Sequence, residues 1–189
     1  MYLNNKEPES IQECIERLKS GTEVLKNEYE YKGTFAKFNP PAKEADIKEY
    51  EDRLGFRLPQ DYREFLLISD GARINYEHIF GLDDIGMNDD YVPEGYLAIT
   101  STELTTDRFA FSEEDGSLYD FFDLNAITLD FKDYLFGLLT TCEEEIIERK
   151  EKRRLAARTP EEIKRDKEKT DALAAKLMKM YEESEKNKK

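Results

Sequence analysis

Two groups of carboxylates are the residues of this chain whose types could do chemistry. The segments LDDIGMNDDY and SEEDGS contain Asp83, Asp84, Asp89, Asp90, Glu113, Glu114 and Asp115. Oxygen ligands of this kind bind calcium, but their spacing does not match the twelve-residue calcium loop. Turns also require polar residues of these types. We therefore interpret both groups as exposed turns that serve a protein-binding surface, because such a surface needs charge and exposure rather than exact ligand geometry.

Side chains that commonly act in catalysis are few. His78 is the one histidine, and without a second histidine or paired cysteines the usual zinc sites are excluded. Cys14 and Cys142 match no ligand spacing, so we expect both to be buried, reduced thiols. The sequence has no GxxxxGK(S/T) phosphate loop, no GxGxxG motif and no GxSxG motif. We predict a protein that is not an enzyme, with no cofactor and no metal.

The charge is distributed unevenly along the chain. There are 29 basic and 43 acidic residues, a formal net charge of −14. Residues 143–189 hold 15 basic and 13 acidic residues, which leaves 14 and 30 for residues 1–142, a net charge of −16. Residues 70–130 contain 15 carboxylates and two basic residues, Arg73 and Arg108. Phosphate binding needs the opposite sign, so we expect no nucleic acid ligand. A basic protein partner fits better, although acidity that only maintains solubility explains the same charge.

Targeting signals are not evident. The chain has no run of about 18 apolar residues, so no membrane span is expected. The first residues, MYLNNKEPES, show no basic region followed by an apolar one, so we expect no secretory signal. The expected location is the cytoplasm.

Helical spacing predicts two helices in the first 54 residues. Ser10 is a suitable N-cap with Glu13 at the capping-box position, and Ser20-Gly21 should end or interrupt this helix. A second helix should run over about 43–54 and stop at Gly55.

A third helix is predicted within LGFRLPQDYREFLLISDG, residues 54–71. Pro59 suits its entry, Asp61 lies in its first turn, and Gly71 suits its end because glycine adopts positive φ at low cost. The apolar stripe predicts that four residues are buried and Tyr62 partly so. The four are Leu54, Leu58, Phe65 and Leu66.

After Gly71 the apolar period changes to two, which predicts strands. ARINYEHIFGL and GYLAITSTEL have this pattern, and in DRFAFSEEDGSLYDFF two runs flank Asp115-Gly116, a good hairpin turn. AITLDFKDYLFGLLTTC resumes helical spacing. We predict an α+β fold with helices on one face of a mainly antiparallel sheet.

The tail from Glu143 is different in composition. It has no glycine, and Thr159-Pro160-Glu161-Glu162 is a helix start with a cap, a proline and a glutamate three positions on. The apolar stripe beyond it is thin and consists of Ile163, Leu173, Leu177, Met180 and Tyr181. We predict a domain over 1–142 and a charged, exposed helical extension over 143–189, with a break near Arg158.

The segment PPAKEADIKEYEDRLGFRLPQDYREFLLISDGA closely resembles the signature of the SUKH superfamily, which includes fungal cell-wall assembly regulators and bacterial immunity proteins. The matching features are Ile47, Glu51, Leu54-Gly55, Leu58-Pro59, Asp61-Tyr62, Phe65-Leu66 and Asp70-Gly71. The likeness covers roughly residues 33–139, with the tail outside it. These positions look like core and turn residues, so they do not transfer as a binding site.

The resemblance implies an α+β fold and, for bacterial members, a protein that neutralises a polymorphic toxin, often a nuclease. Our leading hypothesis is a non-catalytic immunity protein that binds a cognate, basic toxin domain. The alternative is a regulatory scaffold, for example in cell-wall assembly, with the tail helix as its interaction element. A neighbouring toxin gene would favour immunity, and neighbouring cell-wall genes would favour the scaffold.

Overall fold

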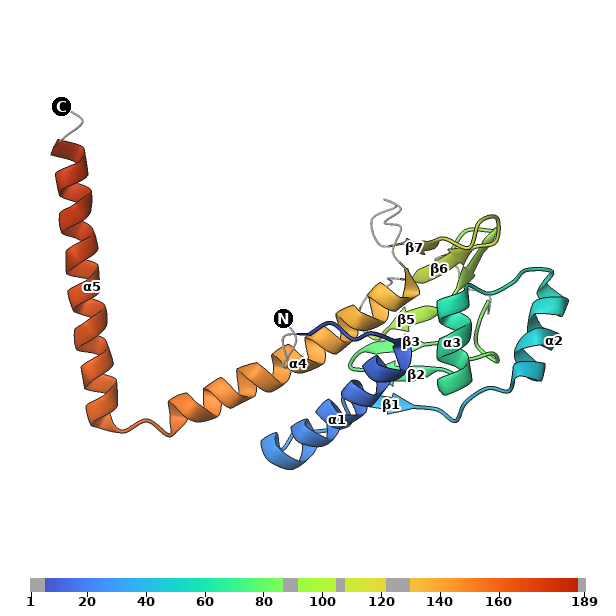
Figure 1. Cartoon of the computed structure of the whole chain (residues 1–189), viewed down its shortest axis with the longest axis horizontal. Coiled ribbons are helices and arrows are strands. Elements are labelled where there is room, and N and C mark those ends of the chain that lie inside the picture. Colours follow the sequence, from blue (N-terminus) through green and yellow to red (C-terminus); the bar gives the residue numbers. More distant parts are fainter. Residues whose placement is uncertain (1–5, 87–91, 105–107, 122–129, 187–189) are drawn as a thin grey trace. The chain divides into compact units, whose positions relative to one another are not determined.

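The computed structural model describes residues 6–86, 92–104, 108–121 and 130–186 (Figure 1). The chain divides into two compact units, Met1–Ile147 and Glu148–Lys189. The first unit contains four of the helices and all the described strands, and the second contains the end of α4 (Phe131–Ala156) and α5 (Pro160–Lys186).

Helix α1 (Ile11–Tyr29) begins as predicted and continues where a break was expected. The Ser10 Oγ accepts a hydrogen bond from the Glu13 amide at 3.1 Å, and a Glu13 carboxylate oxygen accepts from the Glu9 amide at 2.8 Å. The predicted interruption at Ser20-Gly21 is wrong. Gly21 is buried, and a Cβ there would lie 2.7 Å from the Cys142 Sγ in α4. Glycine therefore lets α1 approach α4 closely, and this packing outweighs its unfavourable helix propensity of about 1 kcal/mol.

Helices α2 (Glu44–Leu54) and α3 (Gln60–Ile68) lie close to their predicted ranges, but α3 ends earlier than expected. Gly55 caps α2 in the left-handed conformation, as predicted. The chain leaves α3 at Ser69, which is extended, so Gly71 is not the end of the helix. Gly71 has a φ of +86°, and a Cβ there would lie 2.8 Å from the Gly81 amide nitrogen. Its role is the close approach of two backbones beside β2 (Ala72–Ile74).

Burial agrees with the predicted core except at two positions. Leu58, Phe65 and Leu66 are buried, and Tyr62 is completely buried rather than partly so. Leu54 is 37% exposed, so its predicted burial is wrong. It is the last residue of α2, and its neighbours Arg53 and Gly55 are also exposed. At Leu54 the helix therefore extends beyond the part of the core that it covers.

In the described part of the chain, seven short strands form two antiparallel sheets. One has the order β1-β2-β3-β5 and the other β4-β6-β7. The strands besides β2 are β1 (Ala36–Phe38), β3 (Glu77–Ile79), β4 (Tyr96–Ala98), β5 (Thr100–Thr102), β6 (Phe109–Ser112) and β7 (Leu118–Asp120). Ile99 joins β4 to β5, donating its amide hydrogen to the Phe109 carbonyl and accepting from the Phe80 amide. The segment from β4 to β5 therefore pairs with both sheets.

Helices and sheets meet in an aromatic core, and Figure 1 shows α1, α3 and the start of α4 grouped beside the strands. Leu97, Phe111 and Leu118 are aligned across β4, β6 and β7 and are all buried. The Tyr62 ring of α3 meets the rings of Phe111 at 5.3 Å and Phe131 at 4.9 Å. This arrangement confirms the α+β prediction.

Helix α4 continues through Cys142 without a break. Glu143 and Ile146 are buried, and the Glu143 carboxylate accepts hydrogen bonds from the Arg17 guanidinium of α1 at 2.6 and 3.2 Å. Cys14 and Cys142 are buried free thiols, as predicted, and burial raises the pKa of each to about 12. The compact unit extends to Ile147, a few residues beyond the expected boundary at 142.

Helix α5 starts with the predicted capping box. The Thr159 amide donates to the Glu162 carboxylate at 2.9 Å, and the Glu162 amide donates to the Thr159 Oγ1 at 3.3 Å. The break near Arg158 is confirmed, because α4 ends at Ala156. The side chains of the predicted apolar stripe are between 52% and 70% exposed.

Candidate functional site

The acidic turn between β6 and β7 is held by its own hydrogen bonds. Gly116 has a φ of +72°, which agrees with the predicted hairpin turn at Asp115-Gly116. An Asp115 carboxylate oxygen accepts from the Ser117 amide at 2.9 Å, and this hydrogen bond lowers the pKa of Asp115. The Glu114 amide donates to the Ser112 Oγ at 3.2 Å. The backbone is thus fixed, while Glu113, Glu114 and Asp115 remain exposed.

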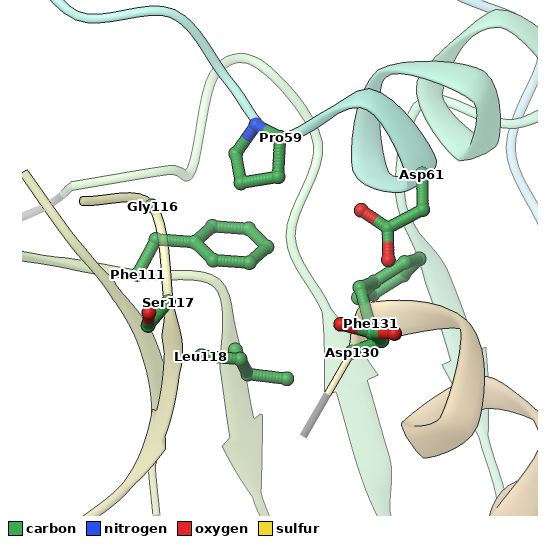
Figure 2. A pocket seen from close by; sticks show the side chains of 8 residues that line it. All are labelled: Pro59, Asp61, Phe111, Gly116, Ser117, Leu118, Asp130 and Phe131. Atoms are coloured by element: carbon green, nitrogen blue, oxygen red, sulfur yellow. The ribbon is translucent and has the colours of Figure 1, made fainter. Parts of the chain in front are cut away.

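A small cavity lies beside this hairpin, between it and the starts of α3 and α4 (Figure 2). Its volume is about 120 Å³. The lining residues are Pro59, Asp61, Phe111, Gly116, Ser117, Leu118, Asp130 and Phe131. Figure 2 shows the Phe111 ring reaching below Pro59 towards Asp61, with Asp130 at the start of α4. The cavity adds two carboxylates, Asp61 and Asp130, to the acidic end of the hairpin.

Asp61 has a role that its position in the sequence did not reveal. It lies in the first turn of α3, where the helix dipole favours a carboxylate. One carboxylate oxygen accepts from the Tyr62 amide at 2.9 Å, and the other accepts from the Lys132 amide in the first turn of α4 at 3.0 Å. Since both oxygens bind backbone amides, the geometry supports a role in joining α3 to α4 rather than in acid–base chemistry.

The second predicted group lies near α2. Asp83 is exposed and lines a cavity of about 360 Å³ together with Asp46 and Glu49 of α2 and Asp70. Asp70 accepts a hydrogen bond from the Leu82 amide at 2.7 Å, which fixes the loop that carries Asp83. No spacing in the sequence links the α2 carboxylates to Asp83, because their proximity depends on the tertiary fold.

The other predicted site residues of this group are Asp84, Asp89 and Asp90. Asp84 is partly exposed, and its amide donates to the Gly81 carbonyl at 3.0 Å in a turn. Asp89 and Asp90 lie outside the described residues. Asp83 lines the cavity near α2 and not the cavity beside the hairpin, so its union with the hairpin carboxylates in one negative face remains a prediction.

The described residues also bear on metal binding and on membrane insertion. Among them, no group of three or more His, Cys, Asp and Glu side chains is arranged to hold a metal ion. None of the helices in the described part of the chain combines the length and the apolar character that crossing a membrane requires. His78 lies in β3, where its ring meets the Phe80 ring edge-on at 5.2 Å.

Comparison with known proteins assigns the chain to a family. The sequence profile of the SMI1/KNR4 family (SUKH-1) matches residues 41–165. The chain belongs to the SMI1/KNR4 family. The match begins just before α2 and extends into α5, so the expectation that the tail after Cys142 lies outside the family likeness is wrong for residues 143–165. Residues 166–189 lie beyond the match. Among curated proteins, none matches the chain.

The SMI1/KNR4 signature residues are mainly core and turn positions in this structure. Glu51 shows how a charged signature residue serves the fold, because it is only 8% exposed. Its Oε1 accepts from the Leu58 amide and from the Arg63 Nε, both at 3.0 Å. Arg63 also donates to Glu44 at 2.5 Å. These contacts hold the loop between α2 and α3, so the signature maintains the scaffold that carries the acidic surface.

Proposed function

We propose that this SMI1/KNR4 family protein is a cytoplasmic, non-catalytic immunity protein that binds and neutralises a cognate polymorphic toxin domain. Two observations support the proposal: membership of a family in which immunity proteins are common, and the exposed carboxylates of the β6–β7 turn. The observation that carries it is the second, because the turn presents Glu113, Glu114 and Asp115 together on a backbone fixed by hydrogen bonds.

An acidic surface suits a toxin that is basic, such as a nuclease. A nuclease attracts the phosphates of its substrate with a positively charged surface, so the carboxylates of an inhibitor are attracted to the same surface. Such charges mainly accelerate association, whereas a few buried contacts determine the lifetime of the complex. Asp83 with Asp46, Glu49 and Asp70 provides a second area rich in carboxylates, which also contains Arg53.

The test is the association rate with the toxin domain encoded by the neighbouring gene. Glu113→Gln with Glu114→Gln, and separately Asp83→Asn with Asp84→Asn, should slow association several-fold at low salt and much less at high salt. Asp89→Asn with Asp90→Asn tests the rest of the predicted group. The matched control is Glu16→Gln with Glu23→Gln, two exposed carboxylates of α1, which change the net charge by the same amount.

Cell survival is the second measurement. Co-expression of the wild-type protein should rescue cells poisoned by that toxin. Equal association rates for all variants would show that the carboxylates only maintain solubility. Failure of the wild-type protein to protect cells against the toxin encoded by the neighbouring gene would contradict the proposed immunity function.

One observation favours the alternative, a regulatory scaffold that works through the tail. Helix α5 exposes Leu173, Leu177 and Met180 on one side, and exposed apolar helix faces are common sites for protein partners. A scaffold predicts that deletion of α5 abolishes partner binding, whereas the immunity function through the β6–β7 turn predicts that binding to the toxin survives.

A further inference from the structure

The sheet β4-β6-β7 has a second face, opposite the one that carries Leu97, Phe111 and Leu118. Because side chains alternate along a strand, Leu97, Phe111 and Leu118 point into the core while their neighbours point away. On this outer face Tyr96 belongs to β4 and Tyr119 to β7, and Phe121 follows β7 on the same face as Tyr119. All three aromatic side chains are partly exposed.

These three rings meet across the intervening strand. Strands β4 and β7 both pair with β6, so they are separated by about 9.6 Å, twice the usual strand spacing. The Tyr96 ring nevertheless lies 5.3 Å from the Tyr119 ring and 5.0 Å from the Phe121 ring, edge to face in both cases. The rings can lean together because β6 has small residues here.

Those small residues are Ala110 and Ser112. Ala110 is directly opposite both Ala98 and Tyr119, and Ser112 is opposite Tyr96. Ala110 and Ala98 are both buried although they lie on this second face, as expected for small side chains beside larger rings. The result is an aromatic cluster, Tyr96–Tyr119–Phe121, that stands on the outer face of the sheet.

The aromatic cluster adjoins the acidic turn. The turn joins β6 to β7, so Glu114 and Asp115 lie only a few residues before Tyr119. The negative charge of Asp115, with smaller contributions from burial, Tyr96 and Glu114, raises the pKa of the Tyr119 phenol. The phenol therefore lies in the field of the turn carboxylates. Arg108 is the basic residue at the other end of this face, beside Phe121.

We propose that the aromatic cluster and the adjoining acidic turn form the centre of the partner-binding surface, and that this centre takes up an arginine-bearing segment of a basic protein. The charge beside the aromatic cluster selects the occupant, because the adjoining turn exposes Glu113, Glu114 and Asp115. Aromatic faces attract guanidinium groups through their electron density, and nearby carboxylates pair with the same group. Partly exposed tyrosines are also common in the few residues that dominate binding energy. The inference rests on the proposed function, whose partner it describes.

The experiment uses a probe that does not depend on the toxin. The isotope-labelled full chain is titrated at low salt with acetyl-Gly-Arg-Gly-Arg-Gly-amide and followed by NMR. The control peptide has citrulline in place of arginine, which keeps the shape and removes the charge. We expect saturable shifts at Tyr96, Tyr119 and Phe121 with the arginine peptide, and none with the citrulline peptide.

Variants distinguish the contribution of the aromatic rings to peptide binding from the contribution of the charge and from any effect on folding. Tyr119→Ala should weaken binding of the arginine peptide roughly fivefold or more, while Tyr119→Phe keeps the ring and should retain binding. Glu113→Gln with Glu114→Gln leaves the rings in place and should weaken binding at low salt. Tyr76→Ala changes a 47% exposed tyrosine outside this sheet and should have no effect. Thermal unfolding of each variant checks that the fold is intact.

Two outcomes would overturn the inference: shifts centred on Asp46, Glu49 and Asp83, or equal responses to the arginine and citrulline peptides. The proposed immunity function and the proposed arginine site can fail independently of each other. If the cluster binds the arginine peptide but the wild type protects no cell from the adjacent toxin, the immunity function fails and the arginine site stands. If the protein neutralises the toxin equally well with Tyr119→Ala, and this variant binds the peptide normally, the immunity function stands and the inference fails.

Discussion

Gly21 shows at the residue scale how one missing side chain determines the packing of two helices. An alanine Cβ at this position would lie 2.7 Å from the Cys142 Sγ and 3.4 Å from the Ile146 Cδ1. Both of these atoms belong to buried side chains of α4, so they have little room to move. The same residue that looks like a helix breaker in the sequence is thus a contact point between α1 and α4.

We predict that Gly21→Ala lowers the free energy of unfolding by about 1–3 kcal/mol, because the overlap with Cys142 exceeds the gain in helix propensity. The matched control is Gly137→Ala in α4, where a Cβ would meet nothing within 4 Å. This change should stabilise by about 0.5–1 kcal/mol. Urea unfolding measures both. An equal stabilisation by the two substitutions would mean that α1 and α4 are less tightly packed than the structure shows.

Phe65 is the aromatic residue of α3 on which the core prediction depends. It is completely buried, and its ring lies 5.3 Å from the Phe131 ring of α4. Phe65→Ala should cost about 3–5 kcal/mol of unfolding free energy, the usual loss for a buried phenylalanine. Leu67→Ala, two positions along the same helix at a 40% exposed residue, should cost about 0.5 kcal/mol or less. Similar losses for the two variants would contradict the assignment of the buried face of α3.

At the scale of elements, the connections between helices depend on buried or partly buried carboxylates. Glu51 joins the end of α2 to the loop before α3, Asp61 joins α3 to α4, and Glu143 joins α4 to α1 through Arg17. Each carboxylate accepts hydrogen bonds from an element far away in the sequence or from a loop. These contacts give a specific geometry to helices that apolar packing alone would hold with less precision.

The hydrogen bonds of Glu51 can be tested by two substitutions, one that removes the acceptor and the charge and one that removes only the charge. Glu51→Ala should cost about 2–4 kcal/mol, because the Leu58 amide loses its acceptor and Arg63 loses a buried partner. Glu51→Gln retains an acceptor for Leu58 and should cost less. Asp52→Ala, at the exposed next residue, is the control in chemical unfolding. Equal costs for the alanine and glutamine variants would show that the charge matters and the acceptor does not.

At the scale of the whole molecule, the two compact units differ in how their apolar residues are used. The first unit buries most of its large apolar residues in one cluster. In α5, Leu173 is 58% exposed, Leu177 57% and Tyr181 70%. The stability of the first unit should therefore be independent of α5.

Deletion of all residues after Arg158 tests this independence. The cut leaves α4 complete, including Glu143 and Ile146, so we expect the melting temperature to change by only a few degrees. Thermal unfolding measures the effect, and sedimentation before and after the deletion measures the oligomeric state. A large drop in melting temperature would show that the apolar residues of α5 complete a core or hold a dimer together.

What the sequence alone determined is local in origin. The capping boxes at Ser10 and Thr159, the left-handed Gly55 and the Asp115-Gly116 turn depend on residues within a few positions of one another, so spacing and residue type predict them. The apolar period likewise predicts α3 and its buried face, and the charge totals predict an acidic surface.

Only the tertiary structure decided the features that depend on distant contacts. The continuity of α1 through Gly21 depends on Cys142, the exposure of Leu54 depends on where the surface beneath α2 ends, and the role of Asp61 depends on Lys132. For the same reason, no pattern in the sequence indicated that Tyr96 would meet Tyr119 over a strand of small residues. Such contacts are set by strand order and helix packing, which bring together residues that no local period connects.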